Sequence, residues 1–303
     1  MLFAASALDH VLDTTDWHFI DLWHWHIPLS PEFQVGGQKV GIITKYSILM
    51  LVAAGLILWI YIPLAKKIRS GETPLGTFWN LFESLLTFIR DKVAKPLIGK
   101  HADDYVPFLW TLFLFVLFCN LLGMFPFLGS PTASMSVTAV LAIIVFLFIH
   151  IQSTMRYGLK AHLLSFAPPM DMPIYIKLPI LVMLWPIEFL GLIIKCFVLA
   201  VRLFANMFAG HIVLGTILLF IPMMQNASEG LFWSVSIASW LGVVALSFLE
   251  LFVAFLQAFL FVFLTALFFG GVLEHAGHAA HGGEHGHGHD DHHGHAEPAG
   301  HHH

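Results

Sequence analysis

Seven side chains that can carry charge or donate hydrogen bonds interrupt two long apolar stretches of the sequence. They are Glu188, Lys195, Arg202, Asn206, His211, Glu250 and Gln257. If these stretches lie in a membrane, each charged group costs about 2.5–3.5 kcal/mol to insert, even on the most lenient scale. Residues kept at such a cost usually serve the passage of an ion or a proton.

The spacing of the first three residues places them on one helical face. Glu188, Lys195 and Arg202 are each seven residues apart, which is two helical turns. Asn206 follows Arg202 by about one further turn. The first apolar stretch is therefore expected to carry a polar stripe along one side.

The second stretch completes this pattern if it runs antiparallel to the first. Gln257 to Glu250 covers about 10.5 Å of helix, and Arg202 to His211 covers about 13.5 Å. If Gln257 is level with Arg202, Glu250 is therefore close to the level of His211. Polar groups then approach one arginine from both membrane surfaces.

This arrangement suits a proton path. Burial moves the pKa values of histidine and glutamate toward neutrality, so His211 and Glu250 could exchange protons on the external side. Arginine stays protonated, so Arg202 would act as a fixed barrier and as an anchor for a carboxylate. Glu188 and Lys195 would lie on the cytoplasmic side.

Structural roles compete with this interpretation for four of the residues. Asn206 and Gln257 could instead form hydrogen bonds between helices. Glu188 and Lys195 could be a structural pair, or could extend toward the membrane surface. Arg202 is harder to explain structurally, because the stretch offers it no nearby acid.

The composition requires a membrane. Hydrophobic residues make up 58% of the 303 residues, charged residues 11%, and the mean hydropathy is +0.80. A soluble domain carries about 25% charged residues. The net charge of -5 leaves no cationic face for nucleic acid. Both cysteines lie in apolar runs, so we expect neither a disulfide framework nor a CxxC metal site, and no cofactor.

Hydropathy and turn residues predict an all-α polytopic fold. It has five membrane-crossing helices, near 46–65, 106–126, 135–155, 179–223 and 231–273. The last two stretches exceed twice the length needed to cross, so we predict a long, tilted hairpin rather than four short helices. Basic residues cluster after residue 65 and again after residue 155, which places residues 66–104 and 156–178 in the cytoplasm.

This topology divides the chain into three parts. Residues 1–42 form an external N-terminal segment, 43–274 the transmembrane domain, and 275–303 a cytoplasmic tail. No basic residue precedes the short apolar start, so we do not expect a cleaved signal. The aromatic, histidine-rich stretch at 18–29 is predicted to be an interfacial anchor; a metal role for His24 and His26 is the weaker alternative.

Two further segments have distinctive composition. Residues 75–95 alternate apolar and charged side chains at helical spacing, which predicts an amphipathic helix in the interface or against a partner. The tail from 274 onward holds twelve of the twenty histidines and is predicted to be disordered. Its alternating His285, His287 and His289 could bind Zn, Ni or Cu without a fixed geometry.

The histidine-rich tail raises an alternative function, a divalent-metal transporter. Such a transporter needs several acidic or histidine ligands that converge at mid-membrane. Here the deepest charge is Arg202, which would repel a metal ion. An inert membrane scaffold would not explain why costly ions follow one path. The residues therefore favour proton translocation.

Two motifs resemble a known family, subunit a (subunit 6) of F-type ATP synthases. Residues 202–211, Arg-Leu-Phe-Ala-Asn-Met-Phe-Ala-Gly-His, look like its signature. Residues 250–259, Glu-Leu-Phe-Val-Ala-Phe-Leu-Gln-Ala-Phe, are similar to its last helix. The likeness covers residues 43–273 and includes Asn120 and Pro126, whereas the tail departs from the family.

The resemblance implies a role for each polar residue. Arg202 matches the stator arginine that faces the carboxylates of the rotating c-ring, and His211 and Glu250 match an acid/base pair of the external half-channel. Asn206 and Gln257 match polar neighbours of that arginine. Glu188 and Lys195 match positions on the side of the cytoplasmic half-channel.

The resemblance also implies the setting of the chain. It would be a non-catalytic stator subunit of the proton-translocating Fo sector. Its partners would be the c-ring, subunit b of the peripheral stalk, the other synthase subunits and the lipid bilayer. The long external N-terminal segment favours a bacterial inner membrane, with the C-terminus in the cytoplasm.

Overall fold

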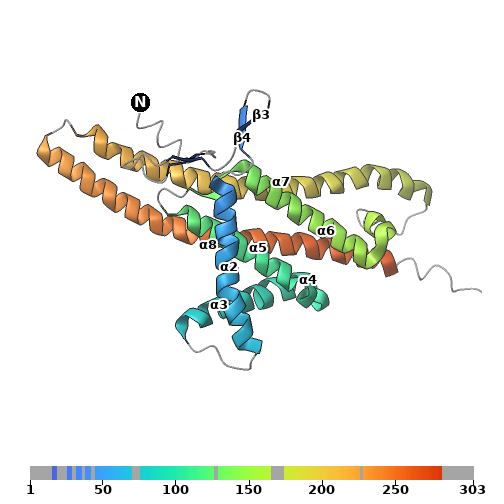
Figure 1. Cartoon of the computed structure of the whole chain (residues 1–303). Helices are drawn as coiled ribbons and strands as arrows, with labels where there is room; N and C mark the ends of the chain where they lie inside the picture. Colours follow the sequence, from blue (N-terminus) through green and yellow to red (C-terminus); the bar gives the residue numbers. More distant parts are fainter. Residues whose placement is uncertain are drawn as a thin grey trace, which may run out of the picture.

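The structure, a computed structural model, describes residues 16–18, 26–28, 32–35, 38–41, 45–69, 76–125, 129–164, 174–225 and 228–281. The described part is dominated by helices (Figure 1). The helices of the first half are α2 (Lys45–Arg69), α3 (Thr77–Phe88), the π-helical η1 (Ile89–Ala94), α4 (Lys95–Ile98), the 3₁₀ turn η2 (Gly99–His101), α5 (Ala102–Gly123), the 3₁₀ turn η3 (Pro131–Ala133) and α6 (Met135–Leu164).

Two very long helices form the second half. α7 spans Ile174–Met223 (50 residues) and α8 spans Glu229–His281 (53 residues), which corresponds to about 75 and 80 Å of helix. They pack against each other along much of their length, and α2 crosses their direction steeply (Figure 1). The prediction of two long helices rather than four short ones is confirmed. Three prolines inside α7 do not divide it.

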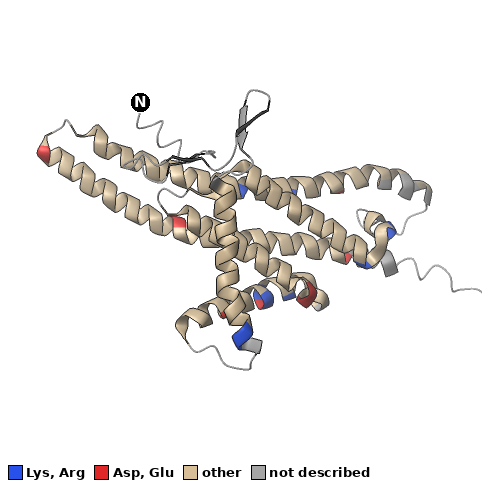
Figure 2. Cartoon of the chain, in the orientation of Figure 1, with Lys and Arg blue, Asp and Glu red and all other residues tan. Residues whose placement is uncertain are grey.

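Among the described residues, four helical segments are long and apolar enough to cross a membrane: Tyr46–Lys67, Ala102–Gly123, Met135–Lys160 and Glu229–Glu274. They coincide with four of the five predicted crossings, and α7 is not among them. The long helices are almost free of charge, while Lys, Arg, Asp and Glu gather in the α3–α4 region and near helix ends (Figure 2). The chain is therefore a polytopic, helical membrane protein.

The structure corrects the sequence analysis at two places, residues 16–41 and the end of α8. Residues 16–41 contain two short antiparallel hairpins, β1–β2 (Asp16–His18, His26–Pro28) and β3–β4 (Glu32–Val35, Gln38–Gly41), which the all-α prediction lacks. β3 and β4 are separated by two glycines, which are typical of tight hairpins. α8 continues to His281, so the tail is helical over 275–281, where alanines favour a helix. Residues 282–303 lie outside the described part.

α6 also extends beyond its predicted end at 155. It continues to Leu164 across a break at Gly158, whose φ of 83° is readily adopted only by glycine. Beyond the break, the buried His162 hydrogen-bonds through Nδ1 to Ser153 Oγ at 2.9 Å. His162 also packs edge-on against His150, whose ring contacts Phe189 of α7. The helix end is thereby held against α7.

A buried polar network joins the α5–α6 turn to α8. Asn120 donates from Nδ2 to the carbonyl oxygen of Ala254 at 3.3 Å. Its Oδ1 accepts a hydrogen bond from Thr132 at 2.7 Å, and Thr132 is linked to Ser130 at 2.7 Å. All three side chains in this network are at most 1% exposed. Because Ala254 follows Glu250 by one turn, the network fixes α8 close to a candidate site residue.

The predicted amphipathic helix at 75–95 consists of three pieces, α3, η1 and α4, and ends at Ile98. The widened π turn precedes Pro96, which has no N–H to continue the α-helical ladder. α3 exposes Phe78, Leu81 and Phe88, whereas η1 buries its apolar residues against α5 and α8. Whether α3 lies in the membrane interface stays a prediction.

Polar contacts and one glycine hold this segment in place. Arg90 donates from Nε and Nη2 to the two carboxylate oxygens of Asp103 at 2.7 and 2.9 Å, and this hydrogen bonding raises the pKa of Arg90. Lys95 donates to Asp91 at 2.6 Å, which lowers the pKa of Asp91. Gly270 of α8 lies so close to the Leu97 carbonyl oxygen that a side chain there would collide with it.

Candidate proton-translocation site

Two contacts define how α7 and α8 are aligned. A Cβ atom at Gly210 would lie 2.8 Å from Oε1 of Glu250, so this carboxylate lies directly against the α7 backbone. Further along, Gly242 lies opposite Ile217, at 3.8 Å from its Cγ2 by the same measure. The helices are therefore antiparallel, and Glu250 is at the level of Gly210 and its neighbour His211.

The same register places Gln257 beside the level of Arg202. Moving eight residues along α7 from Gly210 reaches Arg202, and the equal movement along α8 from Glu250 reaches Ala258. Gln257 is adjacent to that position and is only 3% exposed. The heights of the polar residues thus agree with the spacing argument made from the sequence.

Arg202 lies on an exposed face of α7. Ala205 and Ala209, three and seven residues further along, are also exposed and lie on the same side of the helix. The opposite stripe of α7, including Leu199 and Leu203, is buried in the core. Within the described part of the chain, no carboxylate pairs with Arg202, so its charge lies on an exposed face of α7 without an acid beside it.

The two residues predicted for the cytoplasmic side are not paired with each other. Lys195 Nζ lies over the ring of Phe268 in α8, 5.6 Å from its centroid, a cation–π geometry. Glu188 is half-buried and makes no ion pair with a described residue. The ion-pair alternative for Glu188 and Lys195 is therefore not what this structure contains.

Two buried polar atoms on α8 need a hydrogen-bond partner from water or from another molecule. Oε1 of Glu250 and Nε2 of Gln257 have no hydrogen-bond partner among the described residues. A buried polar group without a partner costs about 1–3 kcal/mol, so such atoms are normally satisfied by water or by another molecule. Asn206, one turn from Arg202, is half-buried. These groups thus place polar atoms at several levels of the α7–α8 pair.

Sequence reasoning missed Gly210 and the role of Asn120 in holding α8. Gly210 is part of the quoted motif, but only the packing of α7 on α8 reveals that its missing side chain makes room for the Glu250 carboxylate. A glycine directly before the half-buried histidine of an apolar helix was the available signal. Asn120 contacts the α8 backbone 134 positions away, and no local pattern predicts such a contact.

Substituting Gly210 with alanine is expected to move the Glu250 carboxylate without changing any charge. The added methyl would approach Oε1 within 2.8 Å, so the flexible carboxylate must shift. We expect proton transport to fall about tenfold while the protein still assembles, since an ångström of displacement can cost even more at a reacting group. The control is Gly191→Ala on the same helix, where no atom lies within 4 Å. Equal transport in both variants would contradict a role for this contact.

The described residues offer no metal site. Among them, no group of three or more His, Cys, Asp or Glu is placed to hold a metal ion. The side chains named for weaker metal binding, those of His24, His26, His285, His287 and His289, lie outside those that the structure describes.

Comparison with known proteins places this geometry in context. The family described as ATP synthase A chain matches residues 47–270. The chain is 34% identical over 274 residues to ATP synthase subunit a 2 of Prosthecochloris aestuarii, covering 89% of this chain and 80% of the relative. It is 36% identical to ATP synthase subunit a of Chloroherpeton thalassium (90% and 78% covered) and 35% identical to that of Myxococcus xanthus (84% and 84% covered).

Proposed function

The chain belongs to the ATP synthase A chain family, and on this premise we propose that it is the stator subunit that provides two half-channels to the rotating c-ring. As a member it is a membrane subunit of the ATP synthase complex, active in proton transport and not itself catalytic. The observation that carries the finer proposal is Arg202, exposed on an apolar face and without an acid partner among the described residues.

In the proposed mechanism a proton enters from outside past His211 and Glu250. It neutralises a carboxylate of the c-ring, and the neutral group can then enter the lipid. After almost a full turn, the carboxylate releases the proton toward Glu188 and Lys195 on the cytoplasmic side. The membrane potential supplies about 2.3 kcal/mol per charge per 100 mV.

Arg202 has two functions in this cycle. It pairs with the newly ionised c-ring carboxylate, which would otherwise be a bare charge in lipid. It also blocks a direct path between the half-channels, because its guanidinium cannot lose its proton. Gln257, buried beside its level on α8, and Asn206 supply neutral hydrogen-bonding groups next to that pair.

The proposed placement follows from the length and charge of the elements. Residues 1–42 are external, the α3–α4 region and the C-terminus are cytoplasmic, and α7 completes the five crossings as the fourth in chain order. The exposed apolar residues of α3 suit the interface or subunit b of the peripheral stalk. Bacterial relatives and the long N-terminal segment favour a bacterial inner membrane.

The divalent-metal transporter has no support from these findings. The family match concerns proton-driven ATP synthesis, and the deepest charge on the long helices is a cation that repels metal ions. The histidine-rich tail is then an appendage to a proton-translocating subunit.

Cysteine cross-linking tests whether the Arg202 face meets the c-ring. In a chain whose native Cys119 and Cys196 are replaced by alanine, Ala205→Cys and Ala209→Cys each should cross-link to a cysteine placed near the c-ring carboxylate. Ala200→Cys is the matched control, because Ala200 is on the same helix but only 2% exposed. The proposal is wrong if only the control position cross-links to the c-ring, or if none of the three positions does.

A further inference from the structure

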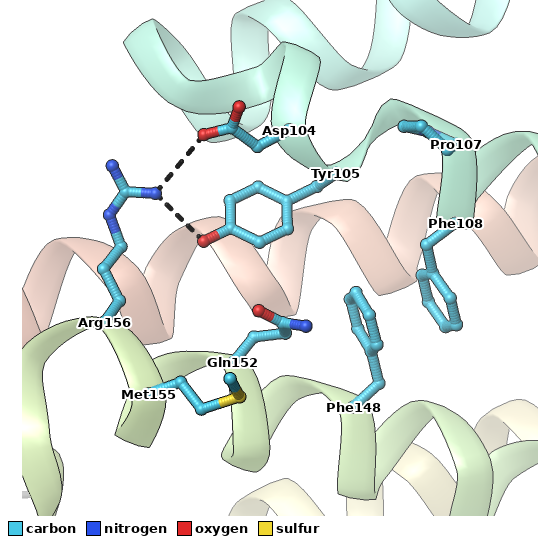
Figure 3. Close-up of a pocket in the computed structure, with 8 residues that line it drawn as sticks. All are labelled: Asp104, Tyr105, Pro107, Phe108, Phe148, Gln152, Met155 and Arg156. Atoms are coloured by element: carbon cyan, nitrogen blue, oxygen red, sulfur yellow. Dashed lines mark hydrogen bonds and ion pairs between the residues drawn. The ribbon is translucent and has the colours of Figure 1, made fainter.

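A cavity of about 460 Å³ lies between α5 and α6, away from the α7–α8 site. In Figure 3 the α5 side chains point toward those of α6, and the α8 ribbon passes behind them. The residues that define its character are Asp104, Tyr105 and Phe108 of α5 and Phe148, Gln152 and Arg156 of α6. The proton path proposed above uses none of them.

One end of the cavity carries charges of both signs. Arg156 Nη1 donates to the hydroxyl of Tyr105 at 3.1 Å and lies 3.6 Å from Oδ2 of Asp104 (Figure 3). The Asp104 side chain is 65% exposed and the Arg156 side chain 27%, so both remain accessible. Both contacts of Arg156 use Nη1, so the Nη2 and Nε donors of its guanidinium make neither of these contacts.

The other end of the cavity is apolar. Phe108 and Phe148 stack with ring centroids 3.6 Å apart and planes within 8°. On the outer face of α6, Ile151 and Met155 are 53% and 77% exposed. In a helix that crosses a membrane, such exposed apolar residues face lipid tails. The cavity therefore has one end with a positive and a negative side chain, near the helix termini. Its other end is lined by aromatic rings within the apolar span.

We propose that this cavity binds the head group of an amine-bearing phospholipid, phosphatidylethanolamine, from the cytoplasmic leaflet. The phosphate would lie against the Arg156 guanidinium, the ammonium against the Asp104 carboxylate, and the upper acyl chain along Phe108 and Phe148. The leaflet rests on the proposed topology, whereas the pairing of charges rests on the cavity alone.

Charge complementarity selects this head group over the alternatives. An anionic head group without an amine satisfies Arg156 but brings a negative charge to Asp104, which is unfavourable. A choline head group has the same net charge as an ethanolamine one, but its methylated nitrogen cannot donate a hydrogen bond to Asp104. Of these three head groups, only ethanolamine gives Asp104 a charge-assisted hydrogen bond.

Photo-labelling of the whole complex tests the proposal. The complex is reconstituted in nanodiscs of phosphatidylcholine with a trace of photoreactive phosphatidylethanolamine, and labelled peptides of this chain are mapped. We expect label on the cavity-lining peptides of α5 and α6. Unlabelled phosphatidylethanolamine should compete about tenfold better than phosphatidylglycerol or phosphatidylcholine, as expected for one charge-assisted hydrogen bond.

Paired variants separate head-group recognition from loss of structure. Asp104→Asn should remove the preference over phosphatidylcholine, and Arg156→Gln should weaken labelling itself, while Arg156→Lys should keep it. Glu274→Gln and Lys160→Gln, exposed charges outside the cavity, serve as controls and should change neither. Three outcomes would overturn the proposal. They are equal labelling with every head group, an unchanged preference in Asp104→Asn, and no label on either helix. The proton-transport assay is read separately, so failure here leaves the stator function standing.

Discussion

Replacing Arg202 with lysine is expected to abolish ATP-driven acidification of inverted membrane vesicles while the subunit still assembles into the complex. Lysine keeps the charge but lacks the planar fork, and it can lose its proton in an apolar setting. Lysine therefore cannot form a bidentate hydrogen bond to a carboxylate, and it does not keep the two half-channels separate. Arg202→Ala should also abolish pumping and let protons leak down an imposed gradient.

The control for Arg202 is Arg90→Lys, the same change at an exposed pair with Asp103 outside the long helices. This variant should acidify vesicles as the unmodified chain does. If Arg202→Lys pumps like Arg90→Lys, the arginine is structural, and the stator mechanism proposed here is wrong.

Removing either His211 or Glu250 is expected to lower proton pumping about a hundredfold, the lower part of the range for a lost acid or base. Exchanging the two, His211→Glu with Glu250→His, should be milder than either single loss to alanine. The exchange keeps one carboxylate and one imidazole at the same level of the α7–α8 pair, because Glu250 lies against Gly210. Vesicle acidification of the native chain, of the chains with His211→Glu or Glu250→His alone, and of the exchanged chain forms a double-mutant cycle.

The cycle can fail in an informative way. If the exchanged chain pumps less than both single variants, the two residues do not work as a pair and the external half-channel lies elsewhere. Glu274→Gln, an exposed acid at the end of α8, is the control for loss of a carboxylate alone and should pump normally.

The sequence was sufficient for the features that depend on length and helical repeat. Two apolar runs without strong turns predict two long helices, and the constant rise per residue then places Glu250 near the level of His211. The lack of an acid partner for Arg202 was also predicted, because no acid lies within reach along its own helix. These properties belong to single helices or to one antiparallel pair.

Contacts that depend on which side chains of two packed helices meet could not be predicted. Lys195 lies over Phe268, and Asn120 bonds to the Ala254 carbonyl, because of how neighbouring helices are packed. Local exceptions were also missed: the break at Gly158 occurs at a glycine that reads as ordinary in a helical run. α8 ends at His281, later in the sequence than predicted, because the histidine-rich composition hid the helix-forming alanines of this segment.

The close approach of Gly270 to the Leu97 carbonyl has a mechanical consequence. In the proposed mechanism a rotor turns against α7 and α8 and exerts torque on them, which the stator must resist. Side chains can change rotamer within nanoseconds, so a contact through them is elastic. Here α8 meets the α4 segment backbone to backbone, with no side chain between them. The stiffness of the stator at this point is that of two helical backbones, and any larger residue at 270 would make the coupling more compliant.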